Sequence, residues 1–194
     1  FANGFLNMTN AVVRRPEGRA SVDALGFDTR TRRLYLTNAV GRLEPTAVAK
    51  AIGPKTASSL EPYRFLEPPL ASVNGWVQTG PGRNPADLRF VIDGGALRFS
   101  KFNSRDIDGE ILWRGQTLTL TNIVAEFYGG ELRGNLVSRF NDDRSADLAF
   151  HLDTKQTELT DFMSDILGKK SGLKGRLDGS LDITANSKDW ESWN

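Results

Sequence analysis

The acidic segment Asp106-Ile107-Asp108-Gly109-Glu110 is the stretch whose residue types come nearest to a metal site. It lacks the third acidic position of a calcium-binding loop, and Ile107 falls in phase with the apolar residues of an alternating strand. We therefore interpret these acids as the solvent-exposed side of a strand. The sequence predicts no metal site here.

Nucleophilic and phosphate-transfer chemistry is not indicated either. The chain has no Cys, which excludes thiolate catalysis, disulfides and cysteine metal sites. Its one histidine, His151, alternates with Phe150 and Leu152, so we expect it to point to solvent. No serine lies in a Gly-x-Ser-x-Gly motif, and Gly168-Lys169-Lys170-Ser171 lacks the upstream glycine of a phosphate-binding loop. We expect no enzymatic activity and no cofactor.

The composition is that of a globular protein without a strong overall charge. Of 194 residues, 39% are apolar and 25% charged, and no apolar run approaches the roughly 20 residues of a membrane helix. The net charge of +1 gives no reason to expect nucleic acid as a partner. Because the chain starts at Phe1 and ends at Asn194 just after an aromatic cluster, we expect a piece of a longer protein.

Basic residues are concentrated near the amino terminus, at Arg14-Arg15 and at Arg30, Arg32 and Arg33. This cluster fits either a patch for phosphate head groups or an ordinary solvated face. No aromatic residues interleave with it as they do in single-stranded nucleic-acid sites. We favour the solvated face.

Apolar and polar residues alternate with period two through much of the sequence, which predicts strands with one dry and one wet face. Turn residues such as Asp93-Gly94-Gly95 and Tyr128-Gly129-Gly130 separate these runs, so we expect an antiparallel meander. The clearest alternating runs are Leu88–Ile92, Ile107–Trp113, Leu132–Phe140, Leu148–Leu152 and Leu173–Ile183.

Two short helices interrupt this pattern. An apolar stripe at helical spacing predicts a helix over about 157–167, with Thr157 as N-cap and Gly168 just past its end. A shorter helix is expected from Pro45 to Gly53. The prolines that crowd residues 54–87 predict a long irregular connection there.

Three related segments, Leu6–Val12, Leu34–Val40 and Leu118–Val124, share the sequence Thr-Asn at their centre. In each, the apolar phase slips by one residue after Thr-Asn. A slip of one residue would turn the rest of the strand inside out, so we predict a β-bulge at each Thr-Asn pair.

The dry face of such a sheet needs a cover. Nine or ten strands at about 4.8 Å spacing span about 45 Å, whereas a short helix shields only two or three of them. Either the sheet curls on itself, a second sheet faces it, or something apolar from outside lies along it. Glycines on the dry face, at 109, 134, 175 and 179, favour tight coiling or close approach of another body.

Residues 118–134, Leu-Thr-Leu-Thr-Asn-Ile-Val-Ala-Glu-Phe-Tyr-Gly-Gly-Glu-Leu-Arg-Gly, resemble the AsmA-like, TamB-related family of bacterial envelope proteins. That family shows an alternating strand, an aromatic-Gly-Gly turn and a strand with a glycine. An extended run that ends in a short amphipathic helix follows, here Leu148–Leu167, and then a Leu-Gly strand, here Leu173–Ile183. The likeness covers about residues 88–194. Residues 1–87 match through the Thr-Asn strands and the helix at 46–52, and no aromatic-Gly-Gly follows Leu43.

The resemblance implies a mainly β protein, a long curled antiparallel sheet forming an open groove or half-barrel with one or two short helices. It implies an amino-terminal repeat over 1–87 and an AsmA-like repeat over 88–194. It further implies a periplasmic protein, anchored in the inner membrane outside this fragment, whose apolar groove carries phospholipid acyl chains toward the outer membrane. Some members are tied to outer-membrane protein assembly, so envelope proteins are expected partners, and no catalytic residues carry over.

The predicted lipid-binding residues are the dry-face side chains of the carboxy-terminal half, with the helix near 158–167 capping one end. They are Leu118, Leu120, Leu132, Leu136, Phe140, Leu148, Phe150, Leu152, Leu177 and Leu181.

Two alternatives remain open from the sequence. The first is a β-sandwich or adhesin that binds carbohydrate or protein, which requires two sheets packed face to face. The second is a structural module whose edge strands pair with another chain.

Overall fold

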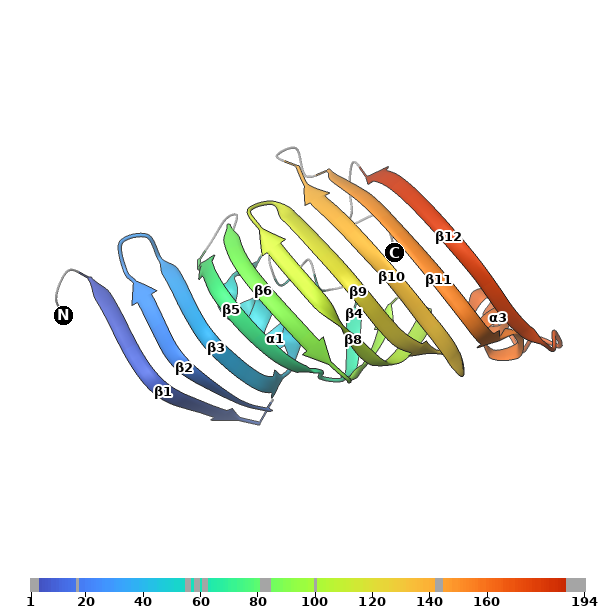
Figure 1. The fold of residues 1–194 in the computed structure, drawn as a ribbon, viewed down its shortest axis with the longest axis horizontal. Helices are drawn as coiled ribbons and strands as arrows, with labels where there is room; N and C mark the ends of the chain where they lie inside the picture. The colour runs from blue at the N-terminus through green and yellow to red at the C-terminus, as the bar shows by residue number, and fades with distance from the viewer. Residues whose placement is uncertain are drawn as a thin grey trace.

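One antiparallel sheet of twelve strands makes up most of the molecule, and it curls without closing into a barrel (Figure 1). The computed structural model describes residues 4–16, 18–54, 57, 60, 63–80, 85–99, 101–141 and 145–187. The mainly β fold, the open curled sheet and the short helices predicted from the sequence are confirmed. The strands are β1 (Phe5–Arg15), β2 (Gly18–Asp28), β3 (Arg33–Leu43), β4 (Tyr63–Glu67), β5 (Leu70–Gln78), β6 (Ala86–Asp93), β7 (Ala96–Phe99), β8 (Phe102–Arg114), β9 (Thr117–Phe127), β10 (Gly130–Phe140), β11 (Ala146–Glu158) and β12 (Arg176–Ser187).

The strand order follows the chain almost throughout, as a meander does. Ten strands run in the order β1-β2-β3-β5-β6-β8-β9-β10-β11-β12, while β4 pairs with β7 and β7 with β8 to one side. The sheet continues through β6, which contains residue 87, because β5 pairs with β6 over Leu70–Val77. A division into repeats at 1–87 and 88–194 stays a prediction.

Two helices are described, α1 (Pro45–Ile52) and α3 (Leu159–Leu167). As predicted, α1 starts at Pro45, and the left-handed Gly168 ends α3 with φ 63°. The prediction of Thr157 as N-cap is wrong. Thr157 is a buried residue of β11, and Glu158 occupies the cap position, because β11 runs directly into the helix.

The irregular connection predicted over residues 54–87 is also wrong. This stretch contains β4, β5 and the first residues of β6. Pro68 and Pro69 fill the turn between β4 and β5, and Pro85 immediately precedes β6. Proline lacks the N–H that a central strand needs, so here it marks strand ends rather than a loop.

The last strand begins later than its alternation predicts, at Arg176 instead of Leu173. Side chains of α3 hold the preceding segment in a different path. Thr160 donates its hydroxyl to the carbonyl oxygen of Leu173 at 2.6 Å, and the N–H of Ser171 donates to Ser164 Oγ at 2.8 Å. These bonds tie residues 171–173 to the helix instead of to β11.

The predicted bulges at Thr37-Asn38 and Thr121-Asn122 are confirmed. Register shifts occur between β3 and β5 and between β9 and β10, and both asparagines are left-handed, with φ 49° and 54°. An asparagine of the next strand accepts the N–H that each bulge leaves outside the ladder. Asn38 donates to Asn74 Oδ1 at 2.8 Å, and Asn122 to Asn135 Oδ1 at 3.0 Å. These side chains meet the hydrogen-bonding need of each bulge.

At Thr9-Asn10 the prediction of a β-bulge is wrong, because no register shift occurs there. Asn10 has φ 53°, but β1 and β2 pair in the same register on both sides of it. The reason is that β2 changes phase directly opposite Asn10. Met8 pairs with Leu25 and Ala11 pairs with Val22, so on both strands two residues three positions apart face the same side. Both strands carry the extra residue, so the register is preserved.

Two further bulges with a left-handed non-glycine residue have no Thr-Asn sequence. They lie at Asp106 in β8 and Gln156 in β11, with φ 46° and 57°, and each coincides with a register shift. Asp178 of β12 accepts the N–H of Gln156 at 2.6 Å, as asparagines do at the other bulges. Side chains of the next strand thus support bulges in several parts of the sheet.

Candidate apolar binding face

One side of the sheet can be followed from strand to strand by its pairing, because directly paired residues point to the same side. A continuous row of partners crosses ten strands, and it contains no charged residue. This row is Met8, Leu25, Leu36, Gly75, Leu88, Trp113, Leu118, Ser138, Leu148 and Ala185.

The next row is apolar at every position over eight strands. It consists of Ala39, Val73, Phe90, Ile111, Leu120, Leu136, Phe150 and Ile183. We call the side of the sheet that carries these two rows the apolar face, and the opposite side the polar side.

All ten residues predicted to bind lipid lie on the apolar face, over the four adjacent strands β9–β12. Leu120, Leu136 and Phe150 are consecutive partners in one row, and Leu152 pairs with Leu181 in another. Nine of the ten are half-buried and Leu181 is 50% exposed. The structure brings these side chains together on one surface, and their role in binding lipid stays a prediction.

The amino-terminal half of the same face is missing from that prediction. Leu25, Leu36, Leu88 and Phe90 continue the two rows onto β2, β3 and β6. The alternation of Leu88, Phe90 and Ile92 was a usable signal for β6. In β2 the signal is hidden, because the change of phase between Val22 and Leu25 breaks the alternation.

Both helices lie on the apolar face, behind the sheet in Figure 1. Ile52 of α1 packs against a core formed by Val77, Ala86 and Leu88. The helix thereby covers the middle of the sheet. At the other end Phe162 of α3 stacks on Phe102 of β8, with ring centroids 6.0 Å apart. Each helix thus covers part of the face. The ten predicted lining residues of β9–β12 stay half-buried or exposed, whereas Ser138 and Ala146 on the same face are buried.

Two side-chain hydrogen bonds hold α3 beside the rings of Phe162 and Phe102. Tyr128 donates its hydroxyl to Asp165 Oδ2 at 2.5 Å, and Asn103 Nδ2 donates to the same oxygen at 3.0 Å. Burial, followed by the hydrogen bond to Asp165, raises the pKa of Tyr128 to about 12. The phenol therefore stays protonated and keeps its bond to the helix over the ordinary pH range.

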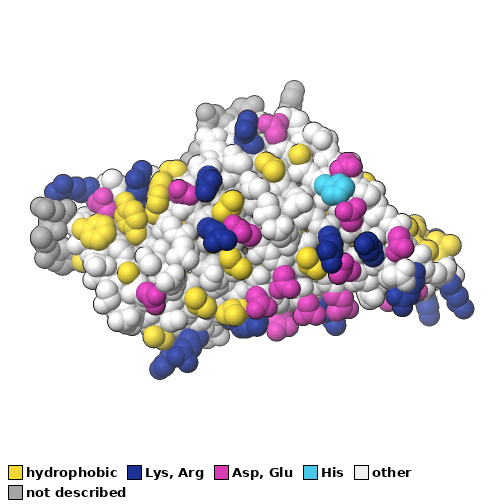
Figure 2. Space-filling model, in the orientation of Figure 1, with side chains coloured by type: hydrophobic (Ala, Val, Ile, Leu, Met, Phe, Trp, Pro, Cys, Tyr) yellow, Lys and Arg dark blue, Asp and Glu magenta, His cyan; other side chains and the backbone are white. Residues whose placement is uncertain are grey.

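The polar side carries the charged residues in cross-strand and neighbouring pairs (Figure 2). Arg89 contacts Glu110 at 2.6 Å, and Arg133 contacts Glu131 at 2.6 Å. His151 lies on this side, as predicted, with its side chain 45% exposed. Its Nδ1 lies 2.7 Å from Asp182 and its Nε2 lies 3.1 Å from Asp153. Hydrogen bonds to these carboxylates raise the pKa of His151, and the bond to Asp182 has the larger effect.

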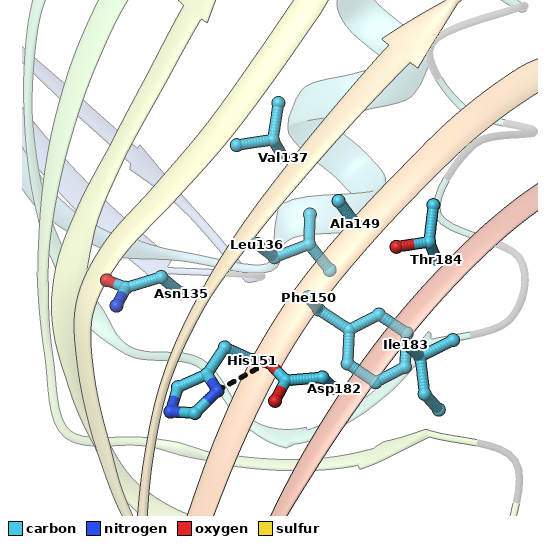
Figure 3. A pocket seen from close by; sticks show the side chains of 9 residues that line it. All are labelled: Asn135, Leu136, Val137, Ala149, Phe150, His151, Asp182, Ile183 and Thr184. Carbon is cyan, nitrogen blue, oxygen red and sulfur yellow. Dashed lines mark hydrogen bonds and ion pairs between the residues drawn. The ribbon is translucent and has the colours of Figure 1, made fainter.

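A shallow hollow of about 260 Å³ lies over β10–β12 (Figure 3). Six of its nine lining residues belong to the polar side: Asn135, Val137, Ala149, His151, Asp182 and Thr184. Its volume is below the range of pockets that enclose a small-molecule ligand. We therefore assign the candidate site to the apolar face and not to this hollow.

Within the described ranges, no group of three or more acidic, histidine or cysteine side chains is placed to hold a metal ion. Neither described helix has the length and apolar character needed to cross a bilayer. Comparison of the chain with protein-family models, with curated proteins and with solved structures gives no match.

Proposed function

We propose that the chain is a segment of an AsmA-like periplasmic protein, and that its apolar face carries phospholipid acyl chains between the inner and outer membranes. The observation that carries this proposal is the row of paired residues, one on each of ten strands, which contains no charged residue. The sheet that carries this row stays open. Large apolar surfaces on soluble proteins usually mark binding sites, because water disfavours leaving them exposed.

The dimensions of the face suit an extended hydrocarbon chain. An acyl chain reaches about 15 Å, half of the bilayer core, whereas an 11-residue strand is about 36 Å long. Each buried methylene contributes about 0.8 kcal/mol, so contact with only five of them gives about 4 kcal/mol. Half-buried leucines leave room for such contact.

Head-group specificity is expected to be low. Ser138 is the polar residue of the ten-strand row, and it is 3% exposed, with no partner for its Oγ among the described residues. A site that selects a head group needs several well-placed donors or acceptors. The lining therefore distinguishes lipids by their chains more than by their head groups.

The family resemblance supplies the cellular setting. In that setting an anchor outside this fragment holds the parent chain in the inner membrane, and envelope proteins are its partners in lipid homeostasis or outer-membrane assembly. Support comes from the quoted motif, which covers most of β9, the turn at Tyr128-Gly129 and the first five residues of β10.

Native mass spectrometry of gently extracted protein tests the proposal. We expect phospholipid to co-purify with the wild-type chain and to be lost from Leu136→Asp, because a carboxylate in the lining cannot be solvated beside an acyl chain. Val137→Asp is the matched control. Val137 is the next residue of β10, it is 43% exposed on the polar side, and its variant should keep the lipid.

Lipid-free wild-type protein would contradict the proposal, and so would equal loss of lipid from both variants. Glycan binding by lipid-free protein would favour the sandwich alternative. That alternative requires two facing sheets, whereas the described strands belong to a single sheet. Pairing through the edge strands β1 and β12 would instead give oligomers whose size does not depend on lipid.

A further inference from the structure

Three arginines lie directly opposite one another on the first three strands. Arg14 of β1 pairs with Arg19 of β2, and Arg19 pairs with Arg42 of β3. Arg42 alternates with Gly41, whose partner Ala71 belongs to the apolar face, so the row lies on the polar side. All three side chains are exposed. Because neighbouring strands are about 4.8 Å apart, the backbone positions of the three arginines span roughly 10 Å.

The arginine row has no carboxylate partner within the described part of the chain. Arg42 donates to the carbonyl oxygen of Pro68 at 3.1 Å, and no acid of the described ranges forms an ion pair with Arg14 or Arg19. Like charges directly opposite each other destabilise a sheet, so folding does not account for this arrangement. Other arginines of the polar side do have acidic partners: Arg89 with Glu110, Arg114 with Asp87 and Arg133 with Glu131.

Exposed valines adjoin the arginine row. Val12 and Val40, one row further along the same side, are 50% and 39% exposed. In Figure 2 basic side chains gather at the lower left, where Figure 1 shows the turn between β1 and β2, and acidic side chains follow the lower rim in the middle. Cations beside exposed apolar side chains suit an anionic bilayer surface, whose phosphates border the acyl region.

We infer that the row of Arg14, Arg19 and Arg42 docks the β1–β3 end of the sheet on the surface of an anionic phospholipid bilayer. The guanidinium groups contact head-group phosphates, and Val12 and Val40 enter the interface beside them. This surface is on the polar side, so it operates whether or not the apolar face holds acyl chains.

Co-sedimentation with vesicles of equal parts phosphatidylcholine and phosphatidylglycerol tests this inference. We expect the 194-residue chain to bind these vesicles and not vesicles of phosphatidylcholine alone. The triple variant R14Q/R19Q/R42Q should bind on the order of 100-fold more weakly, because each arginine near an anionic surface contributes about fivefold. The variant R14K/R19K/R42K keeps the charges and should retain binding. Sodium chloride should weaken binding by screening.

The matched control is R89Q/R114Q/R133Q, which removes the same charge from arginines that have acidic partners. It should bind within about threefold of wild type, because those charges are already compensated. Circular dichroism checks the fold of each variant, and R19Q alone, with an expected loss of about fivefold, serves if the triple variant misfolds. Leu136→Asp should bind the vesicles normally, which separates this test from that of acyl-chain binding.

Four results would overturn the inference. The first is a wild-type chain that does not distinguish the two kinds of vesicle. The second is an equal loss in both glutamine triple variants, which would make net charge the cause. The third is displacement by inorganic phosphate beyond that by sodium chloride of equal ionic strength, which would indicate a free-phosphate site. The fourth is tighter binding to a single-stranded oligonucleotide than to the vesicles.

Discussion

Replacing Gly75 with valine is expected to destabilise the protein by about 3–5 kcal/mol, as measured by urea unfolding. Gly75 lies inside β5 with φ 118°, a conformation that β-branched residues adopt only under strain. A Cβ atom there would lie 1.9 Å from the carbonyl oxygen of Asp87 on β6. Backbone cannot yield as a flexible side chain can, so β5 and β6 would have to separate. A loss of this size is a large fraction of the stability of a typical domain.

Gly179→Val is the matched control, since it makes the same change on the apolar face of the same sheet. A Cβ atom at Gly179 would meet no atom within 4 Å. Valine also favours strands, so the free energy of unfolding should change by less than about 0.5 kcal/mol or rise slightly. Equal destabilisation at the two positions would show that strand packing around Gly75 is not as tight as described.

Replacing Phe162 with alanine is expected to cost about 2–3 kcal/mol and to loosen α3. The ring of Phe162 contacts Phe102, Phe127 and Tyr128, with centroid distances of 6.0, 5.7 and 5.7 Å. Removing it leaves a cavity where the helix meets the sheet. The estimate is below that for a fully buried phenylalanine because Phe162 is half-buried. Urea unfolding and amide hydrogen exchange of residues 159–167 measure the two effects.

Leu167→Ala on the same helix is the control. Leu167 is 50% exposed, and we expect a loss below about 0.5 kcal/mol and unchanged exchange in α3. If Phe162→Ala were as mild as this control, the aromatic cluster would not be what attaches α3 to the apolar face.

The sequence predicts the sheet well where alternation is undisturbed. Leu132–Phe140 alternates except at Val137-Ser138 and forms β10, since its strand has one more buried and one solvated side. Prediction failed where contacts between distant segments decided the structure and the local sequence pattern indicated something else. Proline-rich sequence near Pro68 hid β4 and β5, and hydrogen bonds from α3 delayed the start of β12. The residues of a strand do not reveal which strand it pairs with, and residues 171–173 do not reveal that α3 binds them.

The candidate site shows the same division. The lining residues of β9–β12 follow from alternation, because each of those strands keeps its phase between its own lining residues. The amino-terminal continuation was missed at Val22 and Leu25, where β2 changes phase without a Thr-Asn pair. The row of Arg14, Arg19 and Arg42 depends on pairing between strands, which is why the sequence showed only a diffuse excess of basic residues.

Photo-crosslinking at adjacent residues of opposite sides tests most directly whether the apolar face holds acyl chains. A benzophenone amino acid would replace Leu120, Leu136 or Phe150 on the apolar face, and Thr119, Val137 or Ala149 on the polar side. With radiolabelled phospholipid and illumination, we predict lipid adducts at the first three positions and not at the second three. Equal labelling of both sets, or labelling of the polar side alone, would contradict the account.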